Sequence, residues 1–116
     1  MNVSTQLSDN KAIVTVKADK LEALVAPELK SEFLMANKDK AKDIIVDLSG
    51  VRYCDSSGLS ALLVGNRLCK EADGVFVIAG VNATVKKIII IAQLDKVLNI
   101  VDTVEEAEKK ISELAN

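Results

Sequence analysis

The residue types that could carry chemistry gather in the Asp55-Ser56-Ser57-Gly58 turn. The turn follows an apolar run that ends at Leu48 and a short loop, and it precedes an amphipathic segment that begins at Leu59. Ser and Asp side chains at the start of a helix accept hydrogen bonds from the free N–H groups of its first turn. These N–H groups and the helix dipole also favour an anion, so a domain would tolerate a phosphate on a serine placed there.

Such a phosphate would change the surface more than the fold. It would add a charge of roughly −1.5 to −2 and three strong acceptors, in a chain whose formal charge is −2, beside Asp55 and, as we expect, Asp47. A partner docked over the turn would have to desolvate this dianion, and Gly58 adds no side chain to crowd that partner. A simpler alternative stays open, and turn chemistry alone favours it: Ser and Asp only cap a helix.

Several kinds of catalytic site are excluded by composition. The chain has no histidine, which excludes Ser-His-Asp and Cys-His pairs, a phosphohistidine carrier and metal sites built on histidine. It contains no GxxxxGK[ST] loop and no GxGxxG fingerprint, the motifs that cradle nucleotide phosphates. We therefore expect a protein that is not an enzyme and holds no cofactor or metal, and we rank nucleotide binding as the weakest alternative.

Charge and hydropathy argue against nucleic-acid and membrane binding. The 15 basic residues are balanced by 17 acidic ones and form no basic cluster beyond short pairs such as Lys86-Lys87, so the electrostatic footprint of nucleic-acid binding is missing. The longest apolar run, 88–92, is too short to span a bilayer.

The polar N-terminus does not resemble a signal peptide, and Cys54 and Cys69 form no CxxC pair. We expect a cytoplasmic protein with reduced, buried thiols; a redox-sensing thiol is the less favoured alternative.

The elements that must position the turn follow from hydrophobic periodicity. Residues 2–7 and 12–18 predict two strands of a hairpin joined by a polar turn, and Pro27 fits the first turn of a helix that runs to about Asn37. Two apolar runs, 44–48 and 75–79, predict strands buried on both faces, the second closed by Gly80. Between them, the helix after Asp55–Gly58 is expected to end at Gly74.

The C-terminal part contains one ambiguous segment, 82–92. Its four consecutive isoleucines favour a strand, yet Val85, Ile88 and Ile89 fit one face of a helix. The alternating order of elements favours the helix. Ile90 or Ile91 should then face outward and could contact a partner or a second copy, although core packing is the simpler explanation. Residues 97–101 predict a last strand, and a capping box of Thr103 and Glu106 starts a final helix.

Together these elements predict a single α/β domain spanning residues 1–116. We expect a mixed sheet of about five strands, opened by the N-terminal hairpin and flanked by about four helices. The sequence contains no internal repeat and no interdomain linker.

The segments around the turn resemble the STAS domain. Ile45–Val51 followed by Asp55–Leu59 is similar to its central signature and, more narrowly, to bacterial anti-sigma factor antagonists (anti-anti-sigma factors). Flanking pieces agree with this over essentially the whole chain; they are Ala26–Leu29, Gly80, Leu94–Val97 and Glu105–Ala107. The fold that the resemblance implies matches the one predicted from periodicity.

The resemblance implies a partner-switching regulator of transcription. In that family the first serine of the motif, Ser56 here, is phosphorylated by a serine kinase that also acts as an anti-sigma factor, and a serine phosphatase would reverse this. The unphosphorylated form binds the kinase and frees a sigma factor, and the phosphorylated form releases the kinase. Asp55 would shape the acceptor turn, Ser57 would be the adjacent cap, and Asp47 is a weaker candidate for the same surface.

The sequence differs from the family pattern at two places, and the family also offers a second function. Tyr53-Cys54 stand where the family often has aliphatic or Phe-like residues, so Tyr53 could instead face a partner. The apolar run 88–91 leaves a homodimer possible. Within the same family, the chain could also be an accessory subunit of a membrane transport complex that docks through this surface without phosphorylation.

Overall fold

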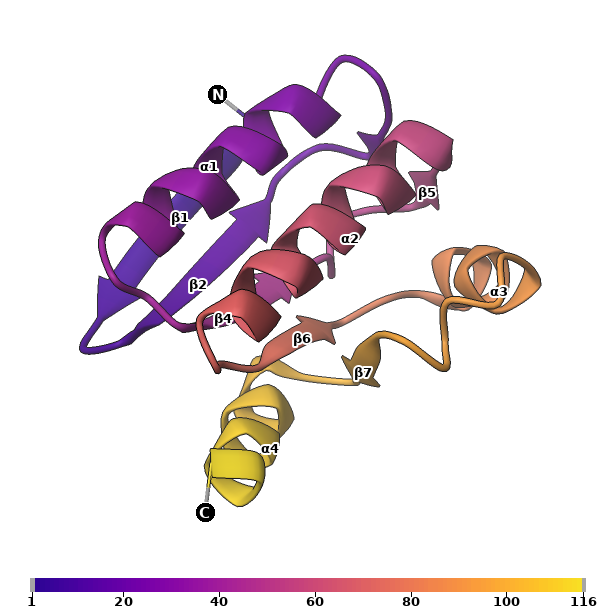
Figure 1. Ribbon diagram of the computed structural model, residues 1–116. Coiled ribbons are helices and arrows are strands. Elements are labelled where there is room, and N and C mark those ends of the chain that lie inside the picture. Colours follow the sequence, from indigo (N-terminus) through magenta and orange to yellow (C-terminus); the bar gives the residue numbers. More distant parts are fainter. Residues whose placement is uncertain (1, 116) are drawn as a thin grey trace.

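In the computed structural model of the chain, which describes residues 2–115, the strands of the main sheet alternate with helices after an opening hairpin (Figure 1). The strands are Val3–Ser8 (β1), Lys11–Val16 (β2), Lys20–Leu21 (β3), Asp43–Asp47 (β4), Tyr53–Cys54 (β5), Phe76–Ala79 (β6) and Asn99–Val101 (β7). The helices are Ala26–Lys38 (α1), Ser56–Glu71 (α2), Ala83–Ile91 (α3) and Val104–Ala115 (α4).

The main sheet has five strands in the order β1-β2-β4-β6-β7, and a separate two-stranded sheet joins β3 to β5. Strands β1 and β2 are antiparallel and are joined by Asp9-Asn10, where Asp9 has φ 55°. Asp and Asn tolerate this left-handed conformation, which two-residue hairpin turns require. The remaining neighbours in the main sheet are parallel. The predicted hairpin and the mixed sheet are thus confirmed.

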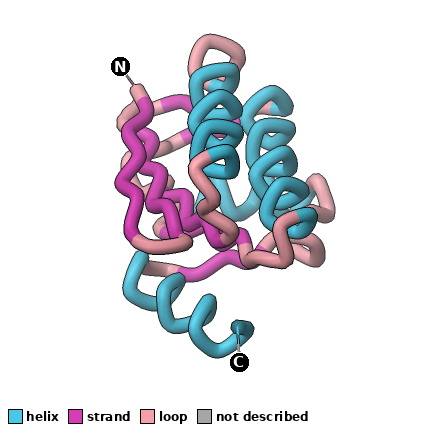
Figure 2. Tube along the Cα trace, turned by 60° about the vertical axis from the view of Figure 1, so that its left-hand side comes forward, coloured by secondary structure: helices cyan, strands magenta, loops and turns pink. Residues whose placement is uncertain are grey.

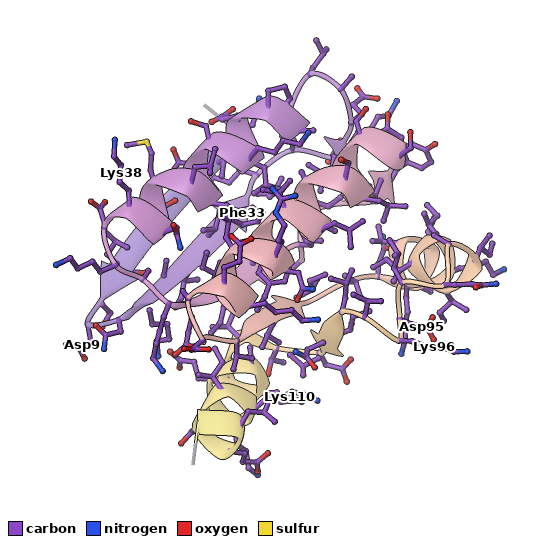
Figure 3. All side chains as sticks on the ribbon, viewed as in Figure 1. Asp9, Phe33, Lys38, Asp95, Lys96 and Lys110 are labelled. Carbon is purple, nitrogen blue, oxygen red and sulfur yellow. The ribbon has the colours of Figure 1, made fainter. Side chains whose placement is uncertain are left out.

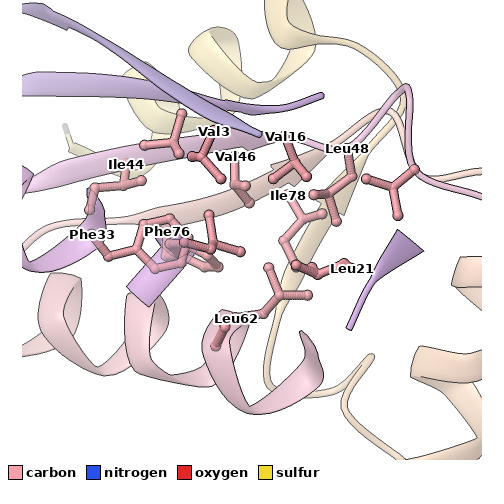
Figure 4. Close-up of a cluster of buried hydrophobic side chains, with 14 of the residues drawn as sticks. Val3, Val16, Leu21, Phe33, Ile44, Val46, Leu48, Leu62, Phe76 and Ile78 are labelled. Atoms are coloured by element: carbon pink, nitrogen blue, oxygen red, sulfur yellow. The ribbon is translucent and has the colours of Figure 1, made fainter. Parts of the chain in front are cut away.

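The sheet is covered on both faces, by α1 and α2 on one side and by α4 on the other (Figure 2). The larger core lies under α1 and α2 and is mostly aliphatic. Its aromatic members are Phe33 and Phe76, whose rings meet edge to face with centroids 5.4 Å apart (Figure 4). Phe33 lies between α1 and α2, whereas Lys38 and Lys110 project from the surface (Figure 3). The smaller core under α4 comprises Ile45, Val77, Ala79, Ala107 and Ile111.

The ambiguous segment 82–92 is helical, as the order of elements predicted. The Asn82 side chain caps α3 by accepting a hydrogen bond from Val85 N–H at 2.8 Å. Val85 and Ile89 are buried, while Ile90 and Ile91 are 48% and 74% exposed. Burial of one helix face and the cap together outweigh the strand propensity of four isoleucines. The outward-facing isoleucines predicted from the sequence are therefore present.

Some element boundaries differ from the prediction. The last strand is shorter than predicted and begins at Asn99. Helix α2 ends at Glu71, and the left-handed residue that follows is Asp73, with φ 59°, so the prediction that Gly74 ends the helix is wrong. Gly74 donates its N–H to the Cys69 carbonyl at 2.7 Å, and the place of its missing Cβ is filled by the Lys42 backbone. Glycine is required at position 74 because the Lys42 backbone leaves no room for a side chain, and not because the backbone is left-handed there.

The described residues, 2–115, contain no helix long and apolar enough to cross a bilayer. The longest helix, α2, has 16 residues and carries polar groups along its exposed face.

Candidate functional site

The short strand pair β3–β5 holds the start of the Asp55–Gly58 turn in place. The Asp19 carbonyl accepts hydrogen bonds from Arg52 N–H at 2.7 Å and Tyr53 N–H at 3.2 Å. Asp55 N–H then donates to the Leu21 carbonyl at 3.2 Å, directly after the two paired positions of each strand. The backbone that enters α2 is therefore tied to a segment more than 30 residues earlier in the chain.

Asp55 is the N-cap of α2. It adopts an extended conformation, with φ −100° and ψ −172°, and its Oδ1 accepts a hydrogen bond from Gly58 N–H at 3.1 Å. A carboxylate at this position also meets the positive end of the helix dipole. The expectation that Ser57 caps the helix is wrong, because Ser56 and Ser57 are already the first two helical residues.

Ser56 and Ser57 differ in their access to solvent. Ser56 is exposed at the first helical position, and within residues 2–115 its hydroxyl has no hydrogen-bond partner. Ser57, one residue on, is half-buried. Ser56 is thus the more exposed of the two serines in the first turn of α2.

Gly58 is buried and faces β3. A Cβ at this position would lie 2.4 Å from the Leu21 carbonyl oxygen and 2.6 Å from Cys54 Sγ, closer than van der Waals contact permits. The missing side chain therefore serves packing within the domain, which differs from the expectation that it leaves room for a partner. Only glycine lets α2 begin so close to β3.

Both thiols of the chain are buried and free; Cys54 adjoins the turn, and Cys69 lies near the other end of α2. Burial is the main cause that raises the pKa of Cys54 from 9.0 to about 12, and the charge of Asp55 adds to it. Burial likewise raises the pKa of Cys69 to about 12. A thiol in this state is a poor nucleophile, because the thiolate is the reactive form.

We expect alkylation of Cys54 and Cys69 by iodoacetamide at pH 8 to be at least about 1000-fold slower in the folded protein than in the unfolded chain. The three-unit rise in pKa alone lowers the thiolate population by that factor. Mass spectrometry over time, with the protein in guanidinium chloride as control, measures both rates. Rapid labelling of the folded protein would show that a thiol is accessible and ionised.

Asp47 and Tyr53 lie in different places relative to the turn. Tyr53 is on β5, two residues before Asp55, and is 45% exposed, so it borders the turn on the surface. Asp47 ends β4, where its Oδ1 accepts a hydrogen bond from Ser49 N–H at 3.0 Å. It lines a hollow of about 240 Å³ together with residues of the α4 side, among them Gly80, Asp102, Thr103 and Glu105. The Asp47 side chain therefore points to the face of the sheet opposite α2, and its place on the surface of the turn stays a prediction.

The residues that sequence reasoning missed lie in β3 and directly before it. Asp19 and Leu21 supply the carbonyl groups that anchor the turn, and no local pattern indicates this, because two-residue strands carry no periodicity. Among residues 2–115, no group of three or more Cys, Asp or Glu side chains is arranged to hold a metal ion.

A family model and several solved structures are similar to this chain. The family model described as STAS domain matches residues 2–107. An anti-sigma-factor antagonist (STAS) domain protein from Planctomyces limnophilus superposes with a TM-score of 0.85 at 21% identity, covering 95% of this chain and 97% of that one. The anti-sigma factor antagonist SpoIIAA in its unphosphorylated form gives 0.81 at 17% identity, covering 98% and 99%.

Two further solved structures extend the comparison. The phosphorylated form of the Bacillus cell fate determinant SpoIIAA gives a TM-score of 0.72 at 16% identity, covering 94% of this chain and 98% of that one. A sulfate transporter family protein from Wolinella succinogenes gives 0.80 at 17% identity, covering 95% and 91%. At these identities the likeness establishes a shared fold.

Proposed function

The chain belongs to the STAS domain family, and within that family we propose that it is an anti-sigma factor antagonist whose partner binding is controlled by phosphorylation of Ser56. The observation that carries the proposal is the exposed Ser56 hydroxyl at the first position of α2, directly after the Asp55 cap. The similar protein SpoIIAA exists in phosphorylated and unphosphorylated forms, which supports a switch of this kind.

The proposed cycle has two states. The unphosphorylated protein binds, in the cytoplasm, a serine kinase that also acts as an anti-sigma factor, and a sigma factor is thereby freed for transcription. Transfer of the ATP γ-phosphoryl group to the Ser56 hydroxyl, with release of ADP and the serine proton, produces the form that leaves the kinase. A serine phosphatase hydrolyses the phosphoester and restores the first state.

The fold explains why the phosphate would act at the surface. Asp55 Oδ1 accepts the hydrogen bond of Gly58 N–H. The N–H groups of Ser56 and Ser57 belong to the first turn of α2, so they have no acceptor inside the helix. These donors and the helix dipole stabilise a phosphate on Ser56. The partner bound against Tyr53 and the start of α2 would instead have to desolvate a dianion next to Asp55. Binding changes while the domain stays folded.

Phosphate transfer from the cognate serine kinase tests the acceptor directly. Incubated with the kinase and ATP, the wild-type protein is expected to gain one phosphate, and Ser56→Ala to gain none. Ser57→Ala is the matched control: it removes the neighbouring hydroxyl but leaves the Asp55 cap, so it should still be phosphorylated. Equal phosphate incorporation by Ser56→Ala and wild type would refute the assignment of Ser56.

A second candidate is an accessory subunit of a membrane transport complex. It is favoured by the similarity of the fold to a sulfate transporter family protein. In this case the surface around Tyr53 and Ser56 docks permanently, without a phosphate. A gene next to transporter subunits, and equal binding of wild type and Ser56→Asp to that complex, would favour this function over the first.

A further inference from the structure

Helix α3 presents apolar and basic side chains to solvent, and no acidic ones. Its exposed side chains include a group that we call the α3 patch, formed by Lys86, Lys87, Ile90 and Ile91. Because positions three and four apart share a helix face, each lysine lies beside one of the isoleucines. Each of the other three helices carries at least one glutamate. The α3 patch therefore differs from the mixed charges found elsewhere on the helices.

The fold does not account for the two exposed isoleucines. Val85 and Ile89 pack into the core beneath α3, whereas Ile90 and Ile91 lie outside it. A β-branched residue at an exposed helix position is less favourable than alanine or lysine, and the last turn of a helix favours a cation. An exposed apolar pair at this place is explained by contact with another molecule.

The α3 patch belongs to an element that adjoins the surface of the Asp55–Gly58 turn. Helix α3 packs against β5, and Tyr53, the exposed residue of β5, borders the turn. Figure 1 shows β5 and α3 at the same end of the molecule as the start of α2. A protein that docks over Ser56 and Tyr53 therefore has α3 beside it.

Given the proposed function, on which this inference rests, we propose that the partner docked over Ser56 also binds the α3 patch, through an apolar surface bordered by carboxylates. The two isoleucines are then removed from water. Lys86 and Lys87 pair with the carboxylates at the rim, where such pairs steer association more than they add affinity. A phosphate on Ser56 repels the same carboxylates, so the patch favours binding and the phosphate opposes it.

Charge decides against a second copy of the chain as the occupant. Two α3 patches that faced each other would bring the lysines of both copies into one interface, and α3 has no carboxylate to pair with them. Asp95, in the turn after the helix, is balanced by its neighbour Lys96 (Figure 3). A membrane surface fits less well, because helices that lie in a membrane interface bury a continuous apolar face. In α3 most of that face is already in the core.

Phosphorylation by the cognate serine kinase, measured over a range of protein concentrations, tests the inference. Ile91→Glu removes an apolar contact and places a carboxylate against an acidic surface, so KM is expected to rise at least about tenfold. The kcat should equal that of wild type, because the Ser56 acceptor is unchanged. The double variant Lys86→Glu, Lys87→Glu should raise KM in the same way. Calorimetric titration of the kinase should show the same loss of affinity.

Leu114→Glu is the matched control. It adds the same charge at an exposed leucine of α4, on the other face of the sheet, so its KM should equal that of wild type. Circular dichroism checks that each variant is folded.

The outcomes separate this inference from the proposed function. A wild-type KM for Ile91→Glu, with Ser56 phosphorylated normally, would overturn the inference and leave the proposed function standing. A wild-type protein that gains no phosphate would refute both. Binding of wild type, but not of Ile91→Glu, to vesicles that contain phosphatidylglycerol would also overturn the inference, because a membrane would then cover the patch. So would a wild-type dimer that Ile91→Glu dissociates, because a second copy would be the occupant.

Discussion

Ser56→Asp is expected to weaken binding to the partner kinase at least about 100-fold, or about 2.7 kcal/mol, while the melting temperature stays within about 3 °C of wild type. The new carboxylate lies at the exposed first position of α2, beside Asp55, where a bound partner must desolvate both charges. In the free domain the same carboxylate meets the positive end of the helix dipole, which stabilises it slightly. Isothermal titration calorimetry and thermal unfolding give the two quantities separately.

Ser31→Asp is the matched control for this prediction. Ser31 is exposed on α1, away from the Asp55–Gly58 turn, so its replacement adds the same charge without touching the proposed contact. Its affinity for the kinase is expected to equal that of wild type. Equal weakening by both variants would mean that overall charge, and not the position of Ser56, governs binding.

Gly58→Ala is expected to lower the free energy of unfolding by about 3 kcal/mol. The new Cβ would meet the Leu21 carbonyl at 2.4 Å, a backbone atom that cannot rotate away, as well as Cys54 Sγ at 2.6 Å. Relief requires α2 to move away from β3, which strains the hydrogen bond between Asp55 N–H and Leu21. Urea denaturation measures the change in stability.

Gly50→Ala provides the comparison within the same chain. The nearest atom to its Cβ is the Val16 carbonyl oxygen at 3.8 Å, an ordinary contact, and its φ lies outside the left-handed region. Its stability is expected to change by less than about 0.5 kcal/mol. If the two variants lost equal stability, the close packing of Gly58 against β3 would not be what holds the turn.

Hydrophobic periodicity predicted most of the fold because the buried faces are regular. The runs that became β4 and β6 are buried on both faces, and the hairpin is set by Asp9-Asn10. The helix over 82–92 was predicted from the order of elements against the propensity of its isoleucines. The prediction was correct because Val85 and Ile89 pack against the core. Intrinsic helix and strand propensities do not include this packing.

The features that could not be predicted depend on contacts between distant segments. β3 and β5 have two residues each and form only because Asp19 and Leu21 meet Arg52, Tyr53 and Asp55. The position of Asp47 on the α4 face depends on how β4 alternates within the finished sheet. The residue types at the turn did indicate a capped helix, yet they did not distinguish Asp55 from the serines as the cap.

The preference for Ser56 over Ser57 now has two independent supports. The family resemblance assigns the first serine of the motif, and the structure leaves the Ser56 hydroxyl exposed while Ser57 is half-buried. The acceptor role is therefore the claim on which the proposed function depends.

Phosphate mapping of the protein purified from its own cells tests that claim most directly. Tandem mass spectrometry of the peptide that contains residues 53–67 resolves Ser56, Ser57 and Ser60 by their fragment ions. We predict a fraction of molecules with a single phosphate, located on Ser56. A phosphate found on Ser57 or elsewhere, with Ser56 unmodified under every growth condition, would contradict the proposed switch.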